Sequence, residues 1–133
     1  MLLKGKHIFL IEDDPVNFAV LQTILKAQGA FVLHDHWGDT TLYNMVNYPY
    51  ELDMIIIDLM LPGDVTGYDI FDAIKNEPKL KDIITVIVSA SDPDIEIPQA
   101  QEKGFTSFIS KPVNRGKLPQ QLLNIMEGKS IWE

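Results

Sequence analysis

Residues 54–58 read Met-Ile-Ile-Ile-Asp, an uninterrupted apolar run that ends on a carboxylate. Four other short apolar runs occupy residues 8–11, 30–33, 85–88 and, more weakly, 106–109. A continuous run rich in Ile and Val is typical of a strand that is buried on both faces, because a strand with one wet face alternates apolar and polar residues. The sequence therefore predicts five buried strands.

Segments with helical periodicity separate these runs. In the first segment Val16, Val20 and Ile24 recur every four residues, which places them on one face of a helix. Asp14 before Pro15 is typical of a capping residue followed by proline at the first helical position. Further helices are predicted from about residue 70 to Pro78, from 118 to Gly128 and, more weakly, over 40–47.

The alternation of strands and helices fixes the expected architecture. Strands that are separated by helices need crossover connections, which are right-handed and give a parallel sheet covered by helices on both faces. We therefore expect an α/β, doubly wound fold in a single domain over residues 1–133, with a core at about 6–126. Residues 129–133 are expected to form a short tail, in which Trp132 contacts a partner or is disordered.

Composition excludes several classes of function. The 133 residues carry 11 Lys and Arg against 19 Asp and Glu, a net charge of −8. Such a chain repels nucleic-acid phosphates and anionic lipid, so we expect no nucleic acid and no membrane as partner. The chain has no cysteine, which excludes disulfides and thiolate chemistry. Its first apolar run is too short for a signal peptide, and a cytoplasmic location is expected.

Polar side chains follow the predicted strands at their carboxyl ends. Glu12 and Asp13 follow the first strand, Asp58 the third, Ser89 the fourth and Lys111 the fifth. In an open α/β sheet, ligands bind at the edge formed by these strand ends. The sequence therefore predicts that three carboxylates, one hydroxyl and one ammonium group converge at one edge.

The chemistry of this cluster favours a metal. Two like charges about 4 Å apart repel by about 4 kcal/mol at an effective dielectric constant of about 20, so we expect a cation among the carboxylates or a protonated carboxyl. Because the available ligands are oxygens, the favoured cation is Mg²⁺. A metal, a nucleophilic carboxylate, a lysine and a hydroxyl together suit phosphoryl transfer onto an aspartate.

Four segments of the sequence stand out together: Ile-Phe-Leu-Ile-Glu-Asp-Asp-Pro-Val-Asn at 8–17, Ile-Asp-Leu-Met-Leu-Pro-Gly at 57–63, Val-Ser-Ala at 88–90 and Ser-Lys-Pro at 110–112. In this order and spacing they resemble the receiver domain of two-component response regulators, and most closely the single-domain receivers. The resemblance extends from Lys6 to about Met126, and it implies a flavodoxin-like (CheY-like) fold with five parallel strands in the order 2-1-3-4-5.

The resemblance also implies roles for individual residues. Asp58 would be the phosphoacceptor, and Glu12, Asp13 and Asp58 would bind Mg²⁺ together with the backbone carbonyl of Met60. Lys111 and Ser89 would assist the transfer as catalytic residues beside Asp58.

Two further implied features involve the fifth strand. Ser89 and Phe108 would form the switch that responds to phosphorylation, although Phe108 is equally explained as ordinary core. Lys111–Pro112 would be a cis peptide, which the proline makes accessible.

The sequence departs from the family pattern at three places, and at one of them Phe108 lacks the tyrosine hydroxyl that is common at its position. Gly67 lies nine residues after Asp58, one more than is usual, which leaves the conformation of this loop open. Pro98 falls where the fourth helix normally runs, and proline inside a helix costs about 3 kcal/mol. We therefore predict a shortened fourth helix over about 99–103, with an extended segment before it.

The expected function is that of a phosphoacceptor response regulator in a two-component or phosphorelay pathway. Its expected partners are a sensor histidine kinase or histidine phosphotransfer protein and a downstream protein target, with room for a homodimer. It would assist its own phosphorylation and would not turn over an external substrate. The alternatives are a Mg²⁺-dependent phosphatase with an aspartate nucleophile, whose usual second acid is replaced by Met60, and a pseudo-receiver that is not phosphorylated.

Overall fold

The computed structural model describes all 133 residues and contains one five-stranded sheet. All strand pairs are parallel, and the strand order is β2-β1-β3-β4-β5, as predicted. This is the flavodoxin-like order, and it places β1 and β3 side by side in the centre of the sheet. The strands are β1 (His7–Ile11), β2 (Phe31–Asp35), β3 (Met54–Ile57), β4 (Thr85–Ser89) and β5 (Ser107–Ser110).

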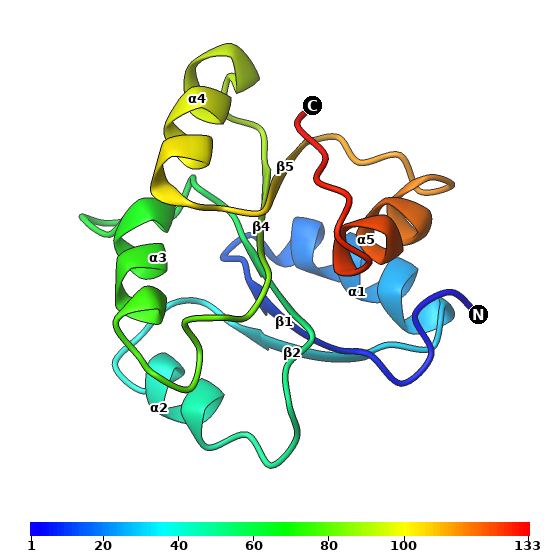
Figure 1. Cartoon of the computed structure of the whole chain (residues 1–133), viewed down its shortest axis with the longest axis horizontal. Coiled ribbons are helices and arrows are strands. Elements are labelled where there is room, and N and C mark those ends of the chain that lie inside the picture. The colour runs from blue at the N-terminus through cyan, green and yellow to red at the C-terminus, as the bar shows by residue number, and fades with distance from the viewer.

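Five helices cover the two faces of this sheet. Helices α1 and α5 lie on one face, whereas α2, α3 and α4 lie on the other (Figure 1). No helix combines the length and the apolar character needed to cross a lipid bilayer. The helices are α1 (Pro15–Ala27), α2 (Thr41–Val46), α3 (Gly67–Lys75), α4 (Pro93–Lys103) and α5 (Leu118–Met126).

The core consists of two apolar layers, one on each face of the sheet. Because successive side chains of a strand point to opposite faces, Ile8 and Leu10 of β1 pack in the layer under α1 and α5, and Phe9 and Ile11 pack in the other. All four residues of β3 are buried. The predicted burial of all five strands is wrong for β2, which lies at the edge of the sheet and has no buried residue, with Phe31 57% exposed.

Helix α4 contradicts the predicted shortened fourth helix. It is helical from Pro93 to Lys103, although Pro98 lies inside it. Asp92 caps its start, since its carboxylate accepts a hydrogen bond of 3.0 Å from the Asp94 N–H. Pro98 has no N–H to donate to the Asp94 carbonyl, but both residues are exposed, so this carbonyl can be hydrated. Ala100 of the same helix is buried against the sheet. Capping and burial thus outweigh the cost of one proline.

The tail expected at residues 129–133 is also different from the prediction. Trp132 forms a parallel bridge with Phe108, so the chain after α5 runs along the outer edge of β5 (Figure 1). Trp132 packs on the layer that contains Phe108, and Ile131 packs on the opposite layer. The expectation of a disordered Trp132 was wrong, because the edge of β5 offers backbone groups and apolar surface to this segment.

Candidate functional site

Asp58 lies at the carboxyl end of the central strand β3, with only 6% of its surface exposed. Its Oδ1 atom accepts a hydrogen bond of 2.9 Å from the Met60 N–H. Gly67, the first residue of α3, lies directly beside it: a Cβ atom at Gly67 would come within 3.0 Å of the Asp58 carbonyl oxygen. Only glycine leaves room for this approach, so the longer loop between Asp58 and Gly67 still brings α3 against the strand end.

Lys111 connects two of the carboxylates. Its Nζ atom lies 2.8 Å from Asp58 Oδ2 and 2.8 Å from Glu12 Oε2. The Lys111 N–H donates to the Ser89 carbonyl oxygen at 2.9 Å, which fixes the backbone from which the side chain extends. The Lys111–Pro112 peptide is cis, as the resemblance implied.

Burial and charge shift the pKa values of this cluster. Burial raises the pKa of Glu12, and the repulsion from Asp58 adds to the effect, while the hydrogen bond from Lys111 opposes it. For Lys111, burial alone would lower the pKa, but the hydrogen bonds to Asp58 and Glu12 outweigh burial and raise it. The ammonium group is therefore held in its charged form between the two carboxylates.

Asp13 lies apart from this ion pair network. It is exposed, and its side chain makes no hydrogen bond or salt bridge, whereas only 3% of the Glu12 surface is exposed. The structure therefore brings together only two of the three predicted carboxylates, Glu12 and Asp58. The cation between them is the ammonium group of Lys111.

The carboxylate and carbonyl oxygens at this edge are the type of ligand that a hard divalent cation prefers. Asp13 is free to turn toward an ion, and Asp58 and the Met60 carbonyl follow each other closely in the chain. No three His, Cys, Asp or Glu side chains already surround a common point, and the side chain of Met60 is 63% exposed. An ion at this edge would be held by few protein ligands, which suits Mg²⁺ because it keeps several of its waters.

The two residues expected to act as a switch are both fully buried. The Ser89 hydroxyl at the end of β4 shares a hydrogen bond of 3.1 Å with the Ser91 hydroxyl and makes no hydrogen bond to Asp58. Phe108 has no exposed surface and belongs to the layer under α2, α3 and α4. In this conformation Phe108 is a core residue.

His34 on β2 is a neighbour of the site that the sequence did not single out. Its Nε2 atom donates a hydrogen bond of 2.7 Å to the carbonyl oxygen of Glu12. Its ring stacks on Phe18 of α1 with 3.7 Å between the ring centroids. The only signal in the sequence is a histidine beside the second apolar run, which does not reveal a contact with residue 12.

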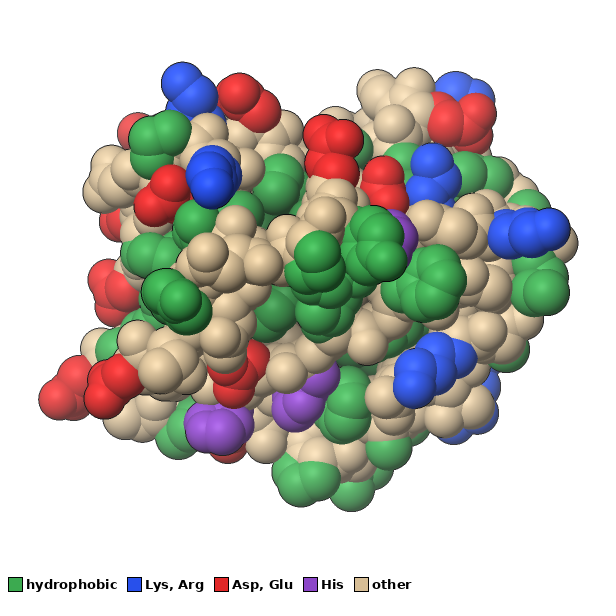
Figure 2. All heavy atoms as spheres, turned by 90° about the horizontal axis from the view of Figure 1, so that it is seen from below, with side chains coloured by type: hydrophobic (Ala, Val, Ile, Leu, Met, Phe, Trp, Pro, Cys, Tyr) green, Lys and Arg blue, Asp and Glu red, His purple; other side chains and the backbone are tan.

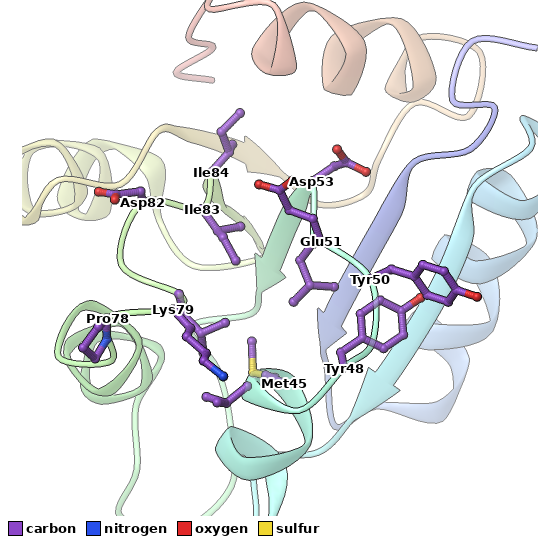
Figure 3. Close-up of a pocket in the computed structure, with 13 residues that line it drawn as sticks. Met45, Tyr48, Tyr50, Glu51, Asp53, Pro78, Lys79, Asp82, Ile83 and Ile84 are labelled. Carbon is purple, nitrogen blue, oxygen red and sulfur yellow. The ribbon is translucent and has the colours of Figure 1, made fainter.

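A hollow lies at the edge of the sheet opposite Asp58, before the amino ends of β3 and β4. It has a volume of about 630 Å³ and is lined by α2 and by the loops that precede the two strands (Figure 3). Figure 2 shows hydrophobic side chains over the middle of the face on the α2 side. Tyr43 and Tyr50 are among the exposed apolar residues. None of the predicted site residues lines this hollow.

A parallel five-stranded sheet of this order, with an aspartate, a lysine and a hydroxyl at its carboxyl edge, agrees with the class that the sequence resembles, the receiver-type signalling domains. The comparison with protein families agrees: residues 8–123 match the response regulator receiver domain. The chain belongs to this family.

Individual relatives support the same assignment. The chain is 31% identical over 107 residues to the two-component response regulator ORR5 of Oryza sativa subsp. japonica, covering 80% of this chain and 78% of the relative. It is 32% identical over 107 residues to ORR11 of Oryza sativa subsp. indica, covering 80% and 71%.

Solved structures share the fold. The receiver domain of the sensor histidine kinase PA1611 from Pseudomonas aeruginosa PAO1, which has magnesium in its active site cleft, superimposes with a TM-score of 0.78 at 24% identity, covering 94% of this chain and 99% of that one. The phosphorylated cyanobacterial phytochrome response regulator RcpA gives a TM-score of 0.73 at 26% identity, covering 92% and 91%.

Proposed function

We propose that this receiver domain accepts a phosphoryl group on Asp58. The observation that carries the proposal is the placement of Asp58: one carboxylate oxygen contacts the Lys111 ammonium at 2.8 Å, and the other accepts the Met60 N–H at 2.9 Å. These contacts fix the orientation of a carboxylate that follows a fully buried strand. A nucleophile held in this way needs little reorganisation before it attacks.

The transfer forms one bond and breaks another at phosphorus. A carboxylate oxygen of Asp58 attacks the phosphorus of a phosphohistidine or a small phosphodonor, and the bond from phosphorus to the leaving group breaks as the new P–O bond forms. Lys111 supplies positive charge where the phosphoryl oxygens gain negative charge. It must then exchange its contact with Asp58 Oδ2 for one with a phosphoryl oxygen.

Mg²⁺, when bound, would neutralise charge on the transferring group. Asp13, Asp58 and the Met60 carbonyl are the ligands proposed for it, and Glu12 would hold these ligands in place. Because Glu12 already accepts hydrogen bonds from Lys111 at 2.8 Å and from the Asp14 N–H at 3.1 Å, its role is to position the loop and the lysine.

Ser89 would respond to the phosphoryl group. Its hydroxyl would leave Ser91 and donate to a phosphoryl oxygen, and this rotation would change the packing near Phe108 and α4. Such a change alters the surface that a downstream protein contacts. The phosphodonor partner would be a histidine kinase or a phosphotransfer protein, in the cytoplasm, and a homodimer is a further candidate assembly.

Incubation with acetyl phosphate and Mg²⁺, followed by intact mass measurement, tests the proposal. The expected result is the addition of one phosphoryl group, which is absent with a chelator and absent in Asp58→Asn. Asp64→Asn, which changes an exposed aspartate of the neighbouring loop, is the matched control and should be labelled like the wild type. Labelling of Asp58→Asn at the wild-type rate would overturn the assignment.

A further inference from the structure

Thr41, the first residue of α2, is a fully buried polar residue to which the proposed reaction assigns no role. Its hydroxyl donates a hydrogen bond of 2.7 Å to Asp35 Oδ2 at the end of β2 and accepts one of 2.9 Å from the Gly38 N–H. The Thr41 N–H in turn donates to the Gly38 carbonyl at 3.3 Å. These contacts join the two ends of the loop between β2 and α2, residues 36–40.

The end of β2 that Thr41 contacts also holds the backbone of Glu12. The Glu12 N–H donates to the Asp35 carbonyl at 3.3 Å, and His34 Nε2 donates to the Glu12 carbonyl at 2.7 Å. Two consecutive residues of β2 therefore fix both backbone groups of Glu12. Since Asp13 follows Glu12 directly, the position of the end of β2 determines where the backbone of Asp13 lies.

The loop between β2 and α2 also lies beside Asp13. A hollow of about 200 Å³ is lined by Asp13, by His36 and Trp37 of this loop, and by residues 61–65 of the loop after β3. Trp37 packs on the apolar layer under α2, α3 and α4, and His36 Nδ1 lies 3.6 Å from Asp35 Oδ1. The loop that Thr41 closes thus forms one wall of the space next to the Asp13 carboxylate.

We propose that Thr41 is a positioning residue for the Mg²⁺ site: through Asp35 it fixes the Glu12 backbone and thereby the place of Asp13. The inference rests on the proposed function, in which Asp13 is a ligand of the ion. A backbone that is fixed before the ion arrives has less freedom to lose on binding, so Mg²⁺ binds more tightly. A hydroxyl that only stabilised α2 would leave the affinity for Mg²⁺ unchanged.

Two variants break the contact between Thr41 and Asp35 from opposite ends. Thr41→Val keeps the shape of the side chain but removes the hydroxyl, whereas Thr41→Ser keeps the hydroxyl and should behave like the wild type. Asp35→Ala removes the carboxylate but keeps the carbonyl that accepts from Glu12, so it tests the same contact even where Thr41→Val does not fold. Asp39→Ala, which removes one negative charge from an exposed residue of the same loop, is the matched control.

Amide hydrogen exchange of the metal-free protein gives the first measurement. In Thr41→Val and in Asp35→Ala, exchange at the Glu12 N–H should accelerate at least fivefold. Ile8 and Ile56 of the buried core should keep their wild-type protection, which verifies the fold. Unchanged exchange at Glu12 in both variants would overturn the proposal.

The affinity for Mg²⁺ is then measured by titration, followed by the NMR shift of the Asp13 amide. The Kd should rise at least threefold in Thr41→Val and in Asp35→Ala. The double variant should show no more than the larger single effect, because both changes remove one shared contact. Wild-type affinity in both single variants, or an equal loss of affinity in Asp39→Ala, would overturn the proposal.

Labelling by acetyl phosphate separates positioning of the ion from chemistry at Asp58. The contacts of Asp58 with Lys111 and with the Met60 N–H do not involve Thr41. In Thr41→Val the Mg²⁺ concentration that gives half of the maximal rate should therefore rise at least threefold, while the maximal rate stays within twofold of the wild type. A lower maximal rate with unchanged dependence on Mg²⁺ would overturn the proposal.

The proposed function fails separately from this inference. A wild type that binds Mg²⁺ but gains no phosphoryl group from acetyl phosphate would refute the phosphoacceptor role of Asp58, whereas the exchange and titration results for Thr41 would stand. A wild type that shows no saturable binding of Mg²⁺ would overturn the positioning role.

Discussion

His34 Nε2 lies 2.7 Å from the carbonyl oxygen of Glu12, and this contact ties the end of β2 to the loop that carries the acidic residues. A carbonyl group only accepts, so the ring must carry its proton on Nε2. The ring is fixed from the other side by its stacking on Phe18. The conformation of the Glu12 backbone therefore depends on a residue of a neighbouring strand.

Replacing His34 tests this dependence. His34→Phe keeps the stacking on Phe18 but loses the hydrogen bond, so the free energy of unfolding should fall by about 1 kcal/mol. Phosphorylation of Asp58 by acetyl phosphate should slow, and Mg²⁺ should bind more weakly, because the loop of Glu12 and Asp13 is less well fixed. Urea unfolding and a fluorescence titration with Mg²⁺ measure the two effects. Wild-type Mg²⁺ affinity in His34→Phe would contradict the role given to this contact.

Asp13 should matter for Mg²⁺ binding and not for the stability of the metal-free fold. Asp13 is exposed and contacts no other charged group, so Asp13→Asn should change the free energy of unfolding without metal by only about 0.5 kcal/mol or less. The same variant should lose most of the stabilisation that Mg²⁺ gives to the wild type. Thermal melts with and without Mg²⁺ provide the comparison. A full Mg²⁺ response in Asp13→Asn would exclude Asp13 as a ligand.

Tyr68 gives a pH-dependent prediction. Its hydroxyl, on α3, donates to the carboxylate of Glu96 on α4, and burial together with Glu96 raises its pKa above the ordinary value of 10.0. Above pH 10 the unfolded chain therefore loses this proton while the folded chain keeps it, so stability falls as the pH rises. Between pH 9 and 11, wild-type stability should decline more steeply than that of Tyr68→Phe. Parallel slopes in urea unfolding would contradict this link.

Phe108 should act first of all as a core residue. Because it is fully buried, Phe108→Ala should cost about 3–5 kcal/mol of unfolding free energy. Tyr43→Ala, at an exposed aromatic residue of α2, is the control and should change stability by about 0.5 kcal/mol or less. Chemical denaturation measures both. A cost near 1 kcal/mol for Phe108→Ala would mean that the ring readily leaves the core, as a working switch requires.

Pro98 should lower the stability of α4. It is exposed and lies inside the helix, so Pro98→Ala restores one backbone hydrogen bond without disturbing the core. The free energy of unfolding should rise by up to about 3 kcal/mol, and amide exchange in Pro93–Lys103 should slow. Hydrogen exchange detected by mass spectrometry resolves this helix. An unchanged exchange rate would show that the proline does not limit the stability of α4.

The sequence by itself determined the strands, their parallel arrangement and the edge at which the polar residues gather. The reason is local: an uninterrupted apolar run such as residues 54–57 is typical of a strand covered on both faces, and helices between strands enforce crossover connections. Asp58 and Lys111 follow such strands directly, so their position at the carboxyl edge could be predicted without coordinates. The capping of α1 by Asp14 was equally local.

The tertiary structure decided what depends on distant neighbours. Only folding shows that Lys111 occupies the space between Glu12 and Asp58, that His34 holds the Glu12 backbone, and that α4 continues through Pro98. Only folding, too, places Trp132 along β5. Each of these contacts joins residues that local patterns treat separately, and burial against the sheet outweighs the preference of a single proline or a short tail.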